Sequence, residues 1–194
     1  MKDWQTENEW LNQQFHQLVL TGADLSEKSF ENCEFNNCEF LNCTFKNSQW
    51  TNCTFSHCNI SNTDIGNSQL DGIRFESCKL LGLHFNTCKK LLFDISLQHC
   101  NILLSNFSNL KLQETDFNAS SLNDCDFYGA DLQKANFTNC ELKGTLFENC
   151  DLRQADFRNA RAYSIDPTQN KLKKAKFSMP EVLSFLALYD LDIE

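Results

Sequence analysis

The sequence predicts an all-β solenoid built from many short repeating units. The first observation is a five-residue period, because large apolar residues occupy every fifth position from Leu20 to Phe85 and again from Leu92 to Phe157. The second is composition, since the chain has 17 Phe and 11 Cys but only 2 Pro and 6 Gly. A period of five fits neither a helix nor a strand, so each unit must be a short extended piece followed by a corner.

The N-terminal segment, residues 1–17, precedes the repeat and is expected to cover that end of the solenoid. Its start, MKDWQTENEW, is acidic and polar where a secretory signal is basic and then apolar, and no later stretch approaches 18 uninterrupted apolar residues. Together with an odd number of cysteines, this predicts a cytoplasmic protein with no membrane partner. The apolar side chains expected to form the cap are Trp4, Trp10, Leu11 and Phe15.

The repeat itself is assigned to residues 18–178. It consists of two frames, which are two series of large apolar residues that each keep the five-residue spacing. The period is interrupted at Lys89 and Lys90 and resumes at Leu92, so two residues have been inserted and the register shifts near 86–91. The insertion is either a binding bulge or a tolerated hinge. Weaker copies continue the second frame at Ala162, Pro167, Leu172 and Phe177.

The cysteines share one position, two residues before a large apolar residue. Residues two apart on an extended segment point to the same side, so this position faces inward. Thiols in one column are parallel and about 4.8 Å apart, farther than the roughly 3.8 Å that a disulfide needs between Cβ atoms. Buried thiols also have raised pKa values and low reactivity, so we expect small apolar fillers and no metal site. The eleven are Cys33, Cys38, Cys43, Cys53, Cys58, Cys78, Cys88, Cys100, Cys125, Cys140 and Cys150.

Nothing in the sequence indicates an enzyme or a cofactor. The four histidines, His16, His57, His84 and His99, fall on outward or corner positions without a paired nucleophile. The chain contains no Gly-rich phosphate loop, HExxH or GxSxG motif. The prediction is a noncatalytic protein without a cofactor.

Runs such as GADLQKANF, CDLRQADF and CEFNNCEF resemble tandem copies of the A(D/N)LXX motif of pentapeptide repeat proteins. The resemblance covers roughly residues 18–178 and implies a right-handed quadrilateral β-helix with four units per coil, in which residues 20 apart stack. Fourteen large positions in the first frame and eighteen in the second then give about eight coils. At roughly 4.8 Å per coil the rod would be about 38 Å long.

The C-terminal segment, residues 179–194, is expected to cap the last coil. Ser178 and Glu181 have the spacing of a capping box, so a short helix should follow through about Tyr189. A strand-like tail, DLDIE, then ends the chain. Its apolar residues exceed what one cap needs, so we expect a symmetric homodimer through this end, formed by Leu183, Leu186, Leu191 and Ile193.

The outward positions of the second frame carry a candidate acidic binding flank. Residues 113–160 hold nine acids and four bases, one net charge per roughly 2.3 Å of rod against about 1.7 Å for duplex DNA. Residues Lys171, Lys173, Lys174 and Lys176 interrupt the negative surface near the expected dimer end. The flank consists of Asp116, Asp126, Asp131, Glu141, Asp151 and Asp156, in which Asp131 should stack on Asp151.

Two functions follow from these features. The first is a noncatalytic scaffold or protein-interaction module with an unassigned partner. The second comes from the resemblance: Qnr-like, MfpA-like and McbG-like members imply a DNA mimic that binds DNA gyrase or topoisomerase IV and protects it from quinolones or toxins. The net charge of -9 argues against direct nucleic-acid binding in either case.

Overall fold

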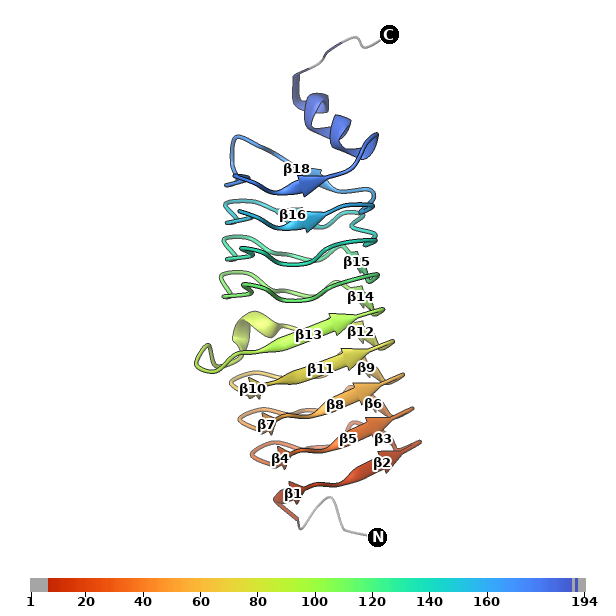
Figure 1. The fold of residues 1–194 in the computed structure, drawn as a ribbon. Helices are drawn as coiled ribbons and strands as arrows, with labels where there is room; N and C mark the ends of the chain where they lie inside the picture. The colour runs from red at the N-terminus through yellow and green to blue at the C-terminus, as the bar shows by residue number, and fades with distance from the viewer. Residues whose placement is uncertain (1–6, 190, 192–194) are drawn as a thin grey trace.

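Segments 20 residues apart in the sequence lie side by side and pair in parallel. Phe15 pairs with Phe35, and Phe35 pairs with Phe55. The computed structural model, which describes residues 7–189 and Leu191, is a β-solenoid of about eight stacked coils, with the first described residues at one end of the rod and the last at the other (Figure 1). The predicted β-helix with 20-residue coils is confirmed.

Each coil has four sides, which we number as walls 1 to 4 in the order the chain meets them. Wall 1 holds β1 (Glu9–Leu11), β4 (Ser29–Glu31), β7 (Gln49–Thr51) and β10 (Gln69–Asp71). Wall 2 holds β2 (Gln14–His16), β5 (Glu34–Asn36), β8 (Thr54–Ser56), β11 (Ile73–Glu76) and β13 (Ile95–Gln98). Wall 3 holds β3 (Val19–Thr21), β6 (Glu39–Leu41), β9 (Asn59–Ser61), β12 (Lys79–Leu81), β14 (Asn101–Leu103) and β15 (Ser121–Asn123).

Later coils continue these walls mostly through single paired residues. On wall 1, Asp131 pairs with Asp151, and on wall 2, Asp116 pairs with Asn136. Wall 4 is built almost entirely in this way. The remaining elements are the pair β16 (Leu146–Phe147) and β18 (Ser164–Ile165) on wall 4, the pair β17 (Asp156–Phe157) and β19 (Lys176–Phe177) on wall 2, and the 3-10 helices η1 (Phe85–Thr87) and η2 (Glu181–Tyr189).

The core is a set of aromatic columns along the rod axis. Phe117, Phe137 and Phe157 stack at centroid distances of 4.7 and 4.8 Å, and Phe127 of the opposite wall meets Phe137 edge-on at 5.9 Å. Stacked and edge-on contacts are both favourable arrangements for aromatic rings. A void of about 30 Å³ beside Trp50 is small enough that the interior is filled by side chains.

The first coil begins inside the segment 1–17. Trp10 pairs with Phe30 through β1 and β4, and Phe15 pairs with Phe35, so both continue the five-residue frame below Leu20. Leu11 is exposed, and Trp4 lies outside the described residues. The end of this coil is closed by another side chain: the Lys28 amine is buried and donates to the Glu7 carbonyl at 2.7 Å.

The two inserted residues lie just after Lys89. The Lys89 amide still bonds the Ser68 carbonyl, whereas Ile73 already pairs with Ile95, 22 residues away. The extra residues therefore fall between Lys89 and Asp94, whose carbonyl accepts the Ile73 amide.

The expectation that Leu92 resumes the inward frame is wrong. Leu92 is exposed with a positive φ of 59°, which places it at a corner of the inserted loop. Leu97 is the first fully regular inward residue after the loop. In Figure 1 this loop and η1 project from the side of the rod.

The frame is also broken near the C-terminal end, where the expectation for Ala162 and Pro167 is wrong. Ala162 has a φ of 55° and forms a corner, so Tyr163 and Ile165 are buried in place of the two predicted positions. Ile165 pairs with Phe147, only 18 residues away. A longer corner follows and restores the 20-residue register, because Asp151 pairs with Lys171 and Asp156 with Lys176.

The capping-box interpretation of Ser178 and Glu181 is wrong, although a helix does end at Tyr189. The Asn159 amide donates to Ser178 Oγ at 3.2 Å, and the Ala162 amide donates to Glu181 Oε1 at 2.8 Å. Both side chains therefore close open amides of the last full coil. The helix itself is 3-10, and its Phe185 packs edge-on against Phe177 and beside Tyr163.

Candidate interaction surfaces

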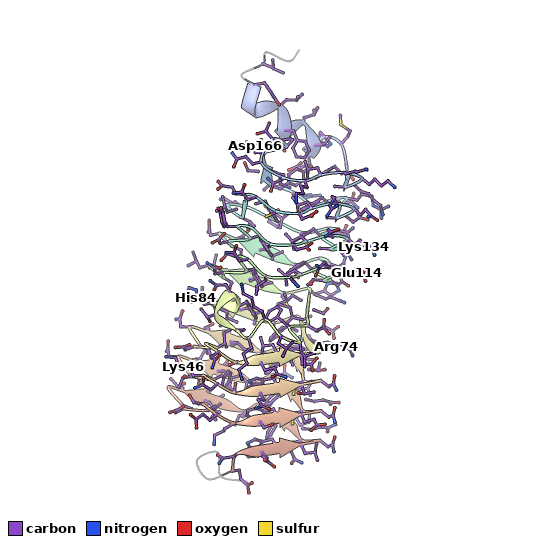
Figure 2. All side chains as sticks on the ribbon, turned by 90° about the vertical axis from the view of Figure 1, so that its left-hand side faces the viewer. Lys46, Arg74, His84, Glu114, Lys134 and Asp166 are labelled. Atoms are coloured by element: carbon purple, nitrogen blue, oxygen red, sulfur yellow. The ribbon has the colours of Figure 1, made fainter. Side chains whose placement is uncertain are left out.

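A depression on wall 4 gathers the charged residues Lys46, Asp64 and His84, two of which, Lys46 and His84, are labelled in Figure 2. Lys46 Nζ lies 2.8 Å from Asp64 in an exposed ion pair. The two hydroxyls in this depression are occupied, because Thr63 donates to the Phe40 carbonyl and Thr87 to the His84 carbonyl. The geometry provides a polar surface and no activated nucleophile.

Within residues 7–189 and Leu191, no three His, Cys, Asp or Glu side chains are arranged to hold a metal ion. No helix in the same part of the chain is long and apolar enough to cross a membrane.

The inward position occupied by the cysteines is a hydrogen-bonding position. Cys58 Sγ donates to the Phe35 carbonyl at 3.2 Å, and Ser120 Oγ donates to the Leu97 carbonyl at 2.8 Å. In each case the acceptor belongs to the large inward residue of the preceding coil, 23 positions earlier. A thiol here is therefore more than the small apolar filler expected from the sequence, because it satisfies a buried carbonyl.

The thiols of Cys125 and Cys140 are structural groups. Burial raises the pKa of Cys125 and of Cys140 to about 12. Since the thiolate is the reactive form, such groups are inert at neutral pH.

The six residues of the predicted acidic flank are distributed over all four walls. Asp131 and Asp151 stack on wall 1 as expected, and Asn136 lies between Asp116 and Asp156 on wall 2. Wall 3 carries Glu141 and wall 4 carries Asp126. The structure thus brings together two columns of the flank on adjoining walls and places the other two residues elsewhere.

Basic neighbours neutralise the two carboxylates nearest the C-terminal end. Arg153 Nη2 lies 2.6 Å from Asp151, and Arg158 Nη2 lies 2.7 Å from Asp156, each in a two-bond arrangement. Hydrogen bonds from these guanidinium groups lower the pKa of both carboxyls. The side chains are only 14% and 15% exposed, so Asp151 and Asp156 remain ionised but present little free negative charge.

Two further outward acids, Asp116 and Asp126, close corners. Asp116 accepts the backbone amide of Asn118 at 3.0 Å, and Asp126 accepts that of Tyr128 at 2.8 Å. Asp and Asn side chains commonly form such turns with an amide two residues further on. Part of the acidity of this repeat therefore has a structural cause.

A surface that the sequence interpretation missed lies on the C-terminal half of wall 4. Tyr128 and Leu146 occupy outward positions of this wall, and Leu104 forms the corner between walls 3 and 4. These positions are polar in most coils, and Leu104, Tyr128 and Leu146 are 57%, 44% and 40% exposed. Asp126 pairs directly with Leu146, and Glu148 lies at the outward position next to it. We call these five residues the wall 4 patch. In the sequence, this patch is indicated by apolar residues at outward positions that are polar in most other coils.

The C-terminal end presents a second apolar surface. Leu183 and Leu191 are exposed, whereas Leu186 is half-buried and Ile193 lies outside the described residues. Tyr189 is also exposed. Of the four residues predicted to form the dimer interface, Leu183 and Leu191 are therefore available to a partner in this structure.

The protein is a repeat protein of the solenoid class, because its coils stack in parallel and side chains fill its interior. Sequence similarity shows the family to which it belongs. The family model described as "Pentapeptide repeat region" matches residues 69–147, and that described as "Pentapeptide repeats (8 copies)" matches residues 14–48, 38–76 and 135–166. The chain belongs to the pentapeptide repeat family.

Solved structures resemble the whole rod. A trypsin-treated variant of QnrB1, a plasmid-mediated fluoroquinolone resistance protein, is 22% identical over 96% of this chain and 89% of its own, with a TM-score of 0.59. HetL, a pentapeptide repeat protein involved in regulating heterocyst differentiation in the cyanobacterium Nostoc, is 16% identical over 89% and 88%, with a TM-score of 0.53. No curated protein sequence shows significant similarity. At these identities the structures share the fold alone.

Proposed function

We propose that this protein is a noncatalytic, cytoplasmic protein-interaction module that binds a protein partner through the wall 4 patch. The observation that carries the proposal is the patch itself: exposed Leu104, Tyr128 and Leu146 beside the acidic Asp126 and Glu148 on a rigid wall. Protein interfaces combine an apolar and aromatic centre with a polar rim. The partner would present basic residues around an apolar contact.

The rest of the molecule supports an interaction module. Core side chains fill the rod, and buried thiols and hydroxyls are used on backbone carbonyls. Function in such a protein falls to the outer surface, where coils hold side chains at fixed spacing.

A crosslinking experiment tests this proposal. A photoreactive amino acid at position 128 should trap one specific protein in cells, and its affinity for purified protein can then be measured. Tyr128→Ser/Leu146→Ser should weaken that affinity at least about tenfold, since central interface residues often contribute 1 to 2 kcal/mol each. Leu91→Ser/Leu92→Ser, which changes two exposed leucines of the inserted loop, is the matched control. Weakening by the control alone would refute the proposal.

We also propose that two copies associate through the C-terminal end. Leu183 and Leu191 leave apolar surface at the tip of the rod. Leu183→Glu/Leu191→Glu should convert a dimer to a monomer in sedimentation, whereas Val19→Glu, at an exposed apolar position near the other end, should not. Deleting residues 179–194 should give a monomer or an insoluble chain, and a soluble dimer would remove the idea.

A second candidate function is a DNA mimic that binds a type II topoisomerase. Residues 113–152 favour it, because they hold eight acidic and two basic residues, and the fold is that of the fluoroquinolone resistance protein QnrB1. Supercoiling by DNA gyrase, with and without quinolone, is the test. Protection or inhibition should weaken in Asp126→Lys/Asp131→Lys and lose salt sensitivity, and no effect of the wild-type protein at micromolar concentration would exclude this function.

A further inference from the structure

Charge is strongly segregated along the rod. Residues 153–176 contain seven basic and two acidic residues, a net charge of +5 in a chain whose total is -9. In the sequence this run follows residues 113–152, with a net charge of -6, and precedes residues 177–194, with four acids and no base. In the rod, a basic belt therefore follows directly on the acidic residues 113–152.

Where this belt meets the preceding coil, a groove crosses the corner between walls 1 and 2. It has a volume of about 560 Å³ and spans three successive coils. Figure 2 labels Lys134, which lines the groove and also reaches Glu114 of the coil below. The groove is lined by Lys134, Asn136, Thr138, Gln154, Asp156, Arg158, Lys174 and Lys176.

The cations of the groove exceed its acids by three. Asp156 holds Arg158 by two bonds and Lys176 at 3.4 Å, so it fixes both cations at the groove surface. Lys174 makes no ion pair within the described part of the chain, and the exposed Lys134 pair with Glu114 is of a kind that contributes little to stability. Two amines are thus available without breaking a strong contact.

We infer that this groove binds a small ligand with two or more phosphate groups. An arginine held in place and several lysines are the side chains that recognise phosphate. The volume lies within the roughly 300 to 1,000 Å³ of small-molecule sites.

The surrounding charge selects a small ligand over a nucleic acid. Two coils span about 10 Å, close to the screening length of about 8 Å at physiological salt. A ligand held by Arg158, Lys174 and Lys176 is therefore about one screening length from Glu114, which lies two coils below Arg158 and pairs with Lys134. A polymer that extends along the rod would meet residues 113–152 and be repelled.

Calorimetry with pyrophosphate as the probe tests the inference on the full-length protein. Pyrophosphate should bind more tightly than inorganic phosphate, and the affinity should fall as salt is raised. Lys174→Glu/Lys176→Glu should weaken binding at least about tenfold, which corresponds to about 1.4 kcal/mol. Lys79→Glu/Lys143→Glu changes the net charge equally on wall 3, away from the groove, and should change the affinity less than about twofold. Lys174→Gln/Lys176→Gln serves if the reversal variant fails to fold.

The outcomes separate clearly. Tighter binding of ADP than of pyrophosphate would identify a nucleotide, and equal binding would identify the phosphate groups as sufficient. Absence of binding at millimolar pyrophosphate would overturn the inference, as would equal weakening in both variants, because that result would reflect overall charge alone.

Discussion

The N-terminal half of the rod, residues 9–82, and the C-terminal half, residues 95–177, turn their corners differently. In the N-terminal half, strands of three or four residues are joined mainly by wide corners, which have no backbone hydrogen bond across the turn. At two of them the Cys38 amide donates to Cys58 Sγ and the Cys58 amide donates to Cys78 Sγ, both at 3.4 Å. In the C-terminal half most corners are tight turns, as when the Ala135 amide donates to the Leu132 carbonyl at 3.0 Å. The backbone amide of the small inward residue therefore donates to a side chain in the first case and to a backbone carbonyl in the second.

The difference teaches that the small inward residue helps to determine the corner. A wide corner needs a side-chain acceptor from the next coil, and only sulfur, hydroxyl or amide groups supply one. Alanine supplies none, so Thr115, below Ala135, and Cys140, below Ala160, close tight turns. Position alone does not decide, because Cys125 in the C-terminal half also donates to a side chain, that of Thr145. A side-chain acceptor permits a wide corner without requiring it, since Ser120 and Ala130 close tight turns below Cys140 and Cys150.

The largest predicted effect tests whether the cores of the two halves are packed equally tightly. Phe35→Ala and Phe137→Ala should each lower the free energy of unfolding by about 3 to 5 kcal/mol, since both rings are fully buried in equivalent stacks. Urea unfolding measures both. A loss below about 1.5 kcal/mol at either position would show that its half is more loosely packed than the structure indicates.

A second prediction concerns the thiols. Cys58→Ala removes the donor to the Phe35 carbonyl and the acceptor for the Cys38 amide, so it should cost about 1 to 3 kcal/mol. Cys140→Ala should cost less, because its thiol donates to the Phe117 carbonyl while the amide below it is held by a turn. Cys58→Ser restores both partners and serves as the control. Equal losses for the two alanine variants would break the proposed link between thiol and corner.

The sequence predicted the fold because the repeat specifies it many times. Each buried position recurs, so a single ambiguous unit such as Leu92 does not affect the rest. Its exceptions were not predictable, because Tyr163 and Ile165 replace Ala162 and Pro167 only after a corner is shortened by two residues. Periodicity identifies where the frame is, but not where the backbone departs from it.

The candidate surfaces were less predictable. Stacking by 20 correctly aligned Asp131 with Asp151, yet it could not show that Arg153 would neutralise Asp151 two residues later along the same wall. The basic groove was visible only as lysines that interrupt the acidic surface. Its depth and its link between coils depend on side-chain directions, which a sequence pattern does not fix.

A third prediction uses the left-handed corner residues. Asn37 and Ala119 occupy equivalent corners, both with a φ of 54°. Asn adopts this conformation at lower cost than alanine, so Asn37→Ala should destabilise the rod by about 1 kcal/mol. Ala119→Gly should stabilise it by up to about 1 kcal/mol, because glycine adopts positive φ without steric cost. Opposite signs in thermal unfolding are the expected result, and a loss in both variants would contradict it.

The smallest predicted effect is a difference in acid sensitivity between the halves. Arg153 lowers the folded-state pKa of Asp151, whereas the Asp64 carboxyl of the N-terminal half pairs with Lys46 in a more exposed contact. A lowered carboxyl pKa stabilises the fold above its unfolded value near 3.9, and that stabilisation is lost as pH falls through the folded value. Unfolding between pH 5 and about 2 should therefore become less pH-dependent in Asp151→Asn than in Asp64→Asn. Identical pH profiles for the two variants would mean that solvent screens both pairs alike, despite the two-bond geometry at Asp151.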